Sequence, residues 1–318
     1  MATRFSTTAF MFPGQGSQVV GMGKDLADAF PAARDTFEQA DDVLGFPLSR
    51  LLFEGAEETL NDTLNTQPAL YVCGIATLRA LQAEAPDASV PLMAGHSLGE
   101  FTALAAAGAF TFEDGLRLVR ERGQLMKRAG EEQPGAMAAV LGLDADTVRD
   151  VCARARAETG GVLVLANDNC PGQVVISGDG DTLERGLALV KEAGARRALR
   201  LAVSIASHSP LMQSVTEEFS RVLDAVPMQA PTATVYGNVT ASPLTDVGSI
   251  RQELRVQLTQ SVRWTESVRA IIERGAERFV ELGPKDVLTG LLRRIDETRV
   301  GVPLNSADTL RQFNQQNV

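Results

Sequence analysis

The feature that most constrains the fold is a repeated order of apolar strand, tight turn and helix. Residues 5–12 are predicted to form a buried strand that stops at Pro13-Gly14. A second, short buried strand is predicted over 90–94, and it leads at once into a turn and the helix-forming residues 98–107. Further helices are predicted over 21–44 and 66–81, where Pro68 suits a first helical turn. This order is typical of a parallel sheet covered by helices, and it predicts an α/β core.

A different rhythm begins near Gly135. Strands are expected over 136–143, 162–166, 173–177 and 197–204, and helices over 144–159 and 181–193. The resulting order, βαββαβ, is the ferredoxin-like pattern. We therefore expect a small ferredoxin-like subdomain over 133–203, inserted into a larger domain made of 1–132 and 204–318.

Composition excludes several functional classes. The chain has 318 residues and a formal net charge of -10, which argues against nucleic-acid binding. No apolar run approaches the roughly 20 residues of a membrane helix, and residues 1–16 lack the pattern of a secretory signal. The three cysteines are widely spaced and form no CxxC pair, so we expect neither a disulfide framework nor a metal site. These features predict a cytoplasmic protein that binds no membrane.

The segment Gly95-His96-Ser97-Leu98-Gly99 joins a predicted buried strand to a predicted helix. A serine on such a turn projects its hydroxyl from the sheet edge, as in the nucleophile elbow of α/β-hydrolase-like cores, and the Leu98 amide would face a developing oxyanion. Capping of the helix by Ser97 explains the same pattern, and GxSxG alone does not decide between the two.

A serine nucleophile needs a base within hydrogen-bond reach, and the chain has only two histidines, His96 and His208. His96 adjoins Ser97 across a sharp turn, where neighbouring side chains diverge. His208 follows a predicted strand, where α/β sites gather. His208 is therefore the candidate base, with a surface-loop histidine as the alternative.

One arginine lies on the apolar face of a predicted helix. Arg122 is centred among Leu118, Val119, Leu125 and Met126 at 100° per residue. A charge in that position needs a partner. The partner is either an internal carboxylate or the free acid of a ligand, which a guanidinium can hold by two parallel hydrogen bonds.

Seven motifs occur in an order that resembles one family. They are FPGQGSQ (12–18), GHSLGE (95–100), the ERG around Arg122, NDNCPGQVVISG (167–178), SIASHSPLM (204–212), VRWTESV (262–268) and ELGPKDVLTGL (281–291). Together they resemble the malonyl-CoA:acyl carrier protein transacylases of fatty acid and polyketide synthesis, over residues from about 7 to 295.

The resemblance implies a ping-pong transfer of malonyl from malonyl-CoA to the phosphopantetheine thiol of an acyl carrier protein, without a cofactor. Ser97 would be the nucleophile, His208 its base, and Arg122 the ligand of the malonyl carboxylate. The amides of Gln15 and Leu98 would hold the oxyanion, and the carbonyl of Gln257 would orient the histidine. The matched positions along the pantetheine path are Gln67 and Asn169.

The chain departs from the family pattern at two places. Lys285-Asp286 stands where the family has a small residue in a GPG-type turn. Ser207 precedes the histidine where many malonyl-selective relatives have phenylalanine, which leaves tolerance of methylmalonyl open. A cluster of Arg196, Arg197 and Arg200 suits an acidic carrier protein, a CoA phosphate or plain solvation.

Two functions compete with malonyl transfer. One is a serine hydrolase that passes the acyl group to water, and the other is a non-catalytic carrier-binding module.

Overall fold

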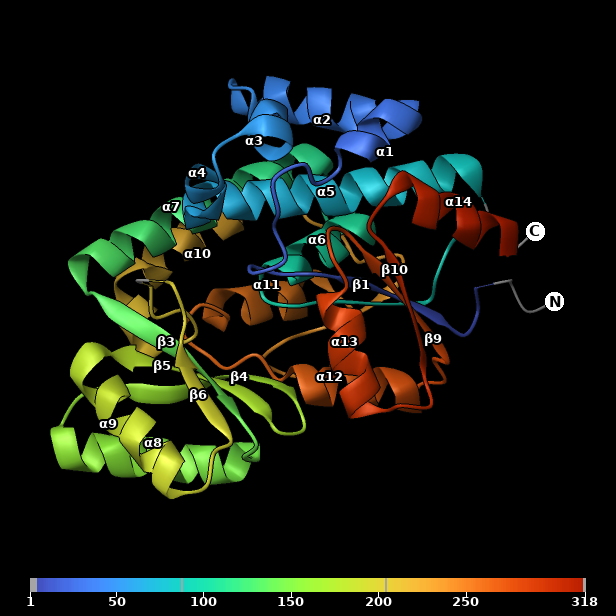
Figure 1. The fold of residues 1–318 in the computed structure, drawn as a ribbon. Helices are drawn as coiled ribbons and strands as arrows, with labels where there is room; N and C mark the ends of the chain where they lie inside the picture. The colour runs from blue at the N-terminus through green and yellow to red at the C-terminus, as the bar shows by residue number, and fades with distance from the viewer. Residues whose placement is uncertain (1–4, 87, 204, 317–318) are drawn as a thin grey trace.

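The computed structural model describes residues 5–86, 88–203 and 205–316. Two sheets organise this part of the chain, one mostly parallel and one antiparallel (Figure 1). The predicted α/β-hydrolase-like core with a parallel sheet is confirmed. So is the second, smaller sheet of the inserted unit.

The larger sheet has six strands in the order β10-β9-β1-β2-β7-β8. All neighbouring pairs are parallel except β7 with β8. The strands are β1 (Thr8–Phe12), β2 (Leu92–Gly95), β7 (Thr234–Tyr236), β8 (Pro243–Leu244), β9 (Arg278–Leu282) and β10 (Val300–Leu304). Because β1 is central and covered on both faces, all of its residues are buried, and the four that follow Thr8 are apolar.

Alternation along β1 separates two hydrophobic cores. Phe10 and Phe12 pack into a core shared with the N-terminal helices, whereas Ala9 and Met11 pack against α12 (Trp264–Glu273) and α13 (Val287–Ile295). Figure 1 shows these two groups of helices on opposite faces of the sheet. The remaining helices of this part are α1 (Lys24–Ala29), α2 (Pro31–Leu44), α3 (Leu48–Glu54), α4 (Glu57–Asn61), α5 (Thr63–Glu84), α6 (Leu98–Ala106), α7 (Phe112–Glu132), the 3-10 turn η1 (Pro210–Val215), α10 (Thr216–Ala225), α11 (Val247–Val256) and α14 (Ala307–Gln316).

The smaller sheet has the order β4-β5-β3-β6 and is antiparallel throughout. Its elements are β3 (Gly135–Leu141), α8 (Ala145–Thr159), β4 (Leu163–Cys170), β5 (Gln173–Asp179), α9 (Gly180–Glu192) and β6 (Arg197–Arg200). This is the predicted βαββαβ order, with both helices on one face (Figure 1). The boundaries 1–132, 133–203 and 204–318 stay a prediction. Val262 joins the two parts, because its N–H donates to Ala166 O (2.8 Å) and its carbonyl accepts from Asp168 N (2.9 Å).

Helix α5 differs from the prediction in a way that matters for the site. It begins at Thr63, with the Asp62 side chain accepting from Leu64 N, so Pro68 lies inside the helix and not in its first turn. Proline has no N–H to donate to the carbonyl four residues earlier. That carbonyl, Leu64 O, accepts instead from Arg120 Nη1 on α7 at 2.7 Å.

The bounds of other elements also differ from the prediction. The single helix expected over 21–44 is two helices, α1 and α2, which meet at Phe30-Pro31 because proline begins a new helix more readily than it continues one. The strand expected over 197–204 ends at Arg200, and Ser204 lies outside the described residues.

Candidate active site

Ser97 lies on the predicted turn between β2 and α6. Its backbone is strained, with φ 51° and ψ -105°, and its side chain does not cap the helix. A Cβ on Gly95 would lie 1.9 Å from Gly99, and a Cβ on Gly99 would lie 2.0 Å from Phe12 O. Only glycine therefore allows the strand, the turn and the helix to pack this closely, and the geometry favours a nucleophile elbow over a cap.

Asn238 holds this turn, and the sequence analysis missed it. Its Oδ1 accepts from Ser97 N at 2.6 Å and its Nδ2 donates to Gly95 O at 2.7 Å. The residue is fully buried just after β7, the strand that pairs with β2. A polar Gly-Asn pair directly after a buried strand was the available signal.

His208 contacts Ser97 from the loop that precedes η1. His208 Nε2 lies 2.8 Å from Ser97 Oγ, and Nδ1 lies 2.8 Å from Gln257 O and 3.1 Å from Gln260 O. Two carbonyl acceptors require a proton on Nδ1, which leaves the lone pair of Nε2 free for the serine hydroxyl. No carboxylate is needed to orient the ring, and Gln260 is a second orienting group that the sequence analysis did not identify.

His208 combines a strained backbone with a lowered pKa. It is one of four non-glycine residues with positive φ in the described chain (φ 58°), as is Ser97. Burial, together with the nearby Arg122 cation, lowers the pKa of His208 to about 3. The imidazole is therefore neutral at physiological pH and can accept a proton.

Arg122 reaches the same point from α7. Its side chain is 1% exposed, and Nη2 lies 3.2 Å from Ser97 Oγ. The helix crossing is close because Gly123 faces α5, where a Cβ would lie 2.9 Å from Thr63 O. The structure thus brings together Ser97, His208 and Arg122, although 111 residues separate the serine from the histidine.

Arg122 has no ionic partner among the described residues. Nη1 donates to Gln67 Oε1 (2.8 Å), Nη2 donates to Gln257 Oε1 (2.9 Å), and Nε is buried without an acceptor in the described chain. The guanidinium also lies 5.4 Å from the Phe101 ring. Burial lowers the pKa of Arg122 to about 10, which still leaves it charged at neutral pH. The alternative of a buried salt bridge is therefore not what the structure shows.

Gln67 and Gln257 take roles that differ in part from the prediction. Gln257 does present its backbone carbonyl to His208, but its side chain also binds Arg122. Gln67 is fully buried and holds Arg122, with its Nε2 donating to Thr63 Oγ1 (3.0 Å). Gln67 is thus a partner of the arginine in this structure, and its place along the pantetheine path stays a prediction.

The two predicted oxyanion donors lie on turns that pack together. A Cβ on Gly14 would lie 2.3 Å from His96 O, so the loop of Gln15 rests directly on the turn of Ser97. The bonds within these turns use Ser17 N, Gly16 N, Gly99 N and Glu100 N. In the described chain they leave the N–H groups of Gln15 and Leu98 without acceptors, as an oxyanion hole requires.

Asn169 and Ser207 flank this centre. Asn169 Oδ1 lies 2.8 Å from His96 Nε2, so His96 turns toward the smaller sheet, and its ring lies 5.5 Å from that of Trp264. Ser207 is half-buried beside His208.

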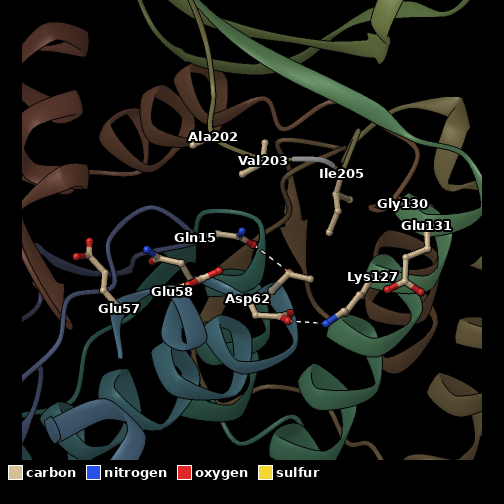
Figure 2. Close-up of a pocket in the computed structure, with 12 residues that line it drawn as sticks. Gln15, Glu57, Glu58, Asp62, Lys127, Gly130, Glu131, Ala202, Val203 and Ile205 are labelled. Atoms are coloured by element: carbon tan, nitrogen blue, oxygen red, sulfur yellow. Dashed lines mark hydrogen bonds and ion pairs between the residues drawn. The ribbon is translucent and has the colours of Figure 1, made fainter. Parts of the chain in front are cut away.

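An open cavity of about 840 Å³ leads away from Gln15 (Figure 2). Residues of the segment that returns from the smaller sheet form one side, and α4, α5 and α7 form the other. Figure 2 shows Lys127 paired with Asp62. Thr63 Oγ1 donates to Gln15 Oε1 at 3.1 Å. The lining residues include the carboxylates of Glu57, Glu58, Asp62 and Glu131.

The departure at Lys285 has a visible consequence. Lys285 adopts φ 63°, a left-handed conformation that favours glycine, and its Nζ lies 3.3 Å from Gly16 O in the Gln15 loop. The turn therefore keeps the backbone shape that suits a small residue, with the lysine side chain extended along the neighbouring loop.

Comparisons with known proteins show the family to which the chain belongs. Residues 9–305 match the family model described as "Acyl transferase domain". The chain is 42% identical over 307 residues to a malonyl CoA-acyl carrier protein transacylase of Bacillus subtilis, covering 96% of this chain and 95% of the relative. This chain belongs to the acyl transferase family.

Two solved structures extend the likeness to three dimensions. An acyl carrier protein S-malonyltransferase from Vibrio cholerae has a TM-score of 0.93 at 42% identity, covering 97% of this chain and 100% of that one. A malonyl-transacylase solved in complex with a type II polyketide synthase acyl-carrier protein has a TM-score of 0.94 at 42% identity, covering 98% of this chain and 100% of that one. Separately, no helix in the described ranges is long and apolar enough to cross a bilayer.

Proposed function

We propose that this protein transfers a malonyl group from malonyl-CoA to the phosphopantetheine thiol of an acyl carrier protein. The observation that carries the proposal is the buried Arg122 cation, which has no ionic partner in the described chain and lies 3.2 Å from Ser97 Oγ. In a malonyl thioester one carbon separates the carboxylate from the reacting carbonyl. A cation this close to the nucleophile therefore suits that short acid. The names of the relatives support the same substrate and acceptor.

The first half-reaction follows from the hydrogen bonds. Ser97 Oγ gives its proton to His208 Nε2 and attacks the thioester carbon, while Gln15 N–H and Leu98 N–H hold the negative oxygen. The C–S bond then breaks, and His208 returns the proton to the departing coenzyme A thiolate. The pantetheine thiol reverses these steps on the malonyl-serine ester. Every proton moves through His208, and the proposed chemistry requires no cofactor.

Binding of the substrate also adjusts the base. The Arg122 cation disfavours protonation of His208 in the empty site. A malonyl carboxylate bound to Arg122 neutralises that charge and raises the basicity of His208 when the proton must move. Binding of the malonyl group therefore makes His208 a stronger base for the reaction of that group.

The test is to mix the protein with malonyl-CoA, with and without holo acyl carrier protein. We expect a malonyl adduct on Ser97 that disappears as malonyl-carrier protein forms, and no adduct in Ser97→Ala. Formation of free malonate at the same rate in both samples would show a hydrolase instead. Competition between malonyl-CoA and methylmalonyl-CoA in the same assay measures how far the small Ser207 admits a branched acid.

A further inference from the structure

Glu100 is a buried carboxyl that the mechanism above does not use. It lies three residues after Ser97 in the first turn of α6 and is 0% exposed. Ser-x-x-Glu is the spacing of a capping box, in which the glutamate would return to the serine N–H. Here that N–H donates to Asn238 Oδ1 instead, so the Glu100 carboxyl is directed elsewhere.

The carboxyl contacts the residue that holds Arg122. Glu100 Oε2 accepts from Gln257 Nε2 at 2.7 Å and from Asn238 N at 3.3 Å. Gln257 Nε2 donates also to Ser97 O at 3.1 Å. Two acceptors on one side fix the amide nitrogen there, and the amide oxygen must then face Arg122 Nη2.

The reverse orientation of this amide is unfavourable on both sides. It would set the NH₂ group against the guanidinium and the oxygen against two acceptors. Glu100 therefore decides which end of Gln257 the arginine meets, although it makes no hydrogen bond to Arg122 itself.

We propose that Glu100 is a positioning residue for acid selection, because it fixes the Gln257 amide and through it the pose of Arg122. The proposal rests on the proposed malonyl transfer. The immediate surroundings of Glu100 include two charged groups, Arg122 on α7 and Glu253 on α11. Glu253 itself accepts from Val239 N and Thr240 N. Burial, with Glu253 nearby, raises the pKa of Glu100 well above its usual range.

The test compares Glu100→Gln with Glu100→Leu in acylation of Ser97 by malonyl-CoA and by acetyl-CoA. Glutamine keeps an acceptor for Gln257 and carries no charge, so we expect it to retain malonyl selectivity. Leucine removes the acceptor. We expect its KM for malonyl-CoA to rise and its malonyl-to-acetyl ratio to fall by about tenfold, with little change in acetyl transfer.

Glu281→Leu is the matched control. Glu281 is also a buried carboxyl, accepting from Leu288 N (3.0 Å) and Thr289 N (2.7 Å) at the start of α13, and burial raises its pKa too. Its loss should lower Tm without changing the selectivity ratio. An equal fall of malonyl and acetyl transfer in Glu100→Leu would mark a merely structural role and overturn the proposal, as would loss of selectivity in Glu100→Gln.

Gln257→Leu keeps the test decisive if Glu100→Leu does not fold. It preserves the backbone carbonyl that orients His208 and removes only the amide, so it should reproduce the selectivity loss. A Gln257→Leu variant with wild-type selectivity would overturn the proposal. Failure of the wild-type protein to form malonyl-Ser97 would instead refute the proposed function.

Discussion

The two ends of the site differ in charge. At the buried end, Arg122 is surrounded by amide oxygens and an aromatic ring, with no ion pair in the described chain. At the open end, the cavity wall carries four carboxylates and one lysine, and the lysine is already paired with Asp62. The positive charge is thus buried. Gln15, a predicted oxyanion donor, lines the open cavity, so we expect an anionic coenzyme to enter past this acidic wall.

This difference in charge means that the site selects the acyl group at Arg122 and does not attract anions in general at its open end. The acidic wall does not attract an anion, so a malonyl carboxylate is favoured only after it reaches Arg122. There the low local dielectric makes the pairing stronger than at the surface. The same burial keeps His208 neutral. Changes at the buried end should therefore alter which acyl group reacts, and changes at the open end should alter how readily the coenzyme arrives.

The largest effect is expected for Arg122→Ala. Loss of the charge-assisted pair should lower kcat/KM for malonyl-CoA by about 10- to 150-fold, or about 1.5–3 kcal/mol. Transfer from acetyl-CoA should rise relative to malonyl, because an apolar face then lines the site. Steady-state kinetics with both substrates measure the ratio, and an unchanged preference for malonyl would remove Arg122 from its proposed role.

Asn238→Ala should act on the buried end without changing selection. It removes the acceptor for Ser97 N and the donor for Gly95 O, so the strained turn loses its support. We expect kcat to fall by about tenfold for malonyl-CoA and acetyl-CoA alike, equivalent to about 1.4 kcal/mol. A fall confined to malonyl would instead connect Asn238 to Arg122.

The pH dependence of activity and stability tests the buried end of the site. Because the pKa of His208 is lowered to about 3, kcat/KM of the free enzyme should show no histidine titration near pH 6.5. In Arg122→Ala the acid limb should move to higher pH, since the cation that opposes protonation is gone. The folded protein should also lose stability as pH falls below 6.5, because the unfolded chain binds a proton there that buried His208 does not. A wild-type limb at pH 6.5 would contradict the assignment.

The smallest effect is expected at the open end. Glu57→Gln and Glu58→Gln remove exposed carboxylates, and each should lower the KM for malonyl-CoA about two- to threefold at low salt, with less effect at high salt. The malonyl-to-acetyl ratio should stay constant. A changed ratio would place selection at the cavity wall as well as at Arg122.

Local pattern was enough to predict much of the site. Glycines about Ser97 and the apolar neighbours of Arg122 are features of single segments, and both expectations agree with the structure. With two histidines in the chain, the choice of His208 needed little more. The order of elements likewise predicted both sheets.

The rest depends on contacts between distant segments. Asn238 and the Gln257 side chain are 141 and 160 residues from Ser97 in sequence, and no local spacing connects them. The SLGE spacing would have predicted a capping box, whereas tertiary contacts redirect its glutamate. Helix α5 begins earlier than proline chemistry predicts, because another helix satisfies the carbonyl that Pro68 leaves free.

The contact between Arg120 and Leu64 O also affects the position of Arg122 beside the nucleophile. On α7, Arg120 binds Leu64 O and Asn65 Oδ1, and two residues later Arg122 binds Gln67 on the same partner helix. A slip of one residue between the two helices would separate both arginines from their acceptors. The ring nitrogen of Pro68, which cannot donate, thus helps to set the longitudinal registry at which the guanidinium stands beside the nucleophile.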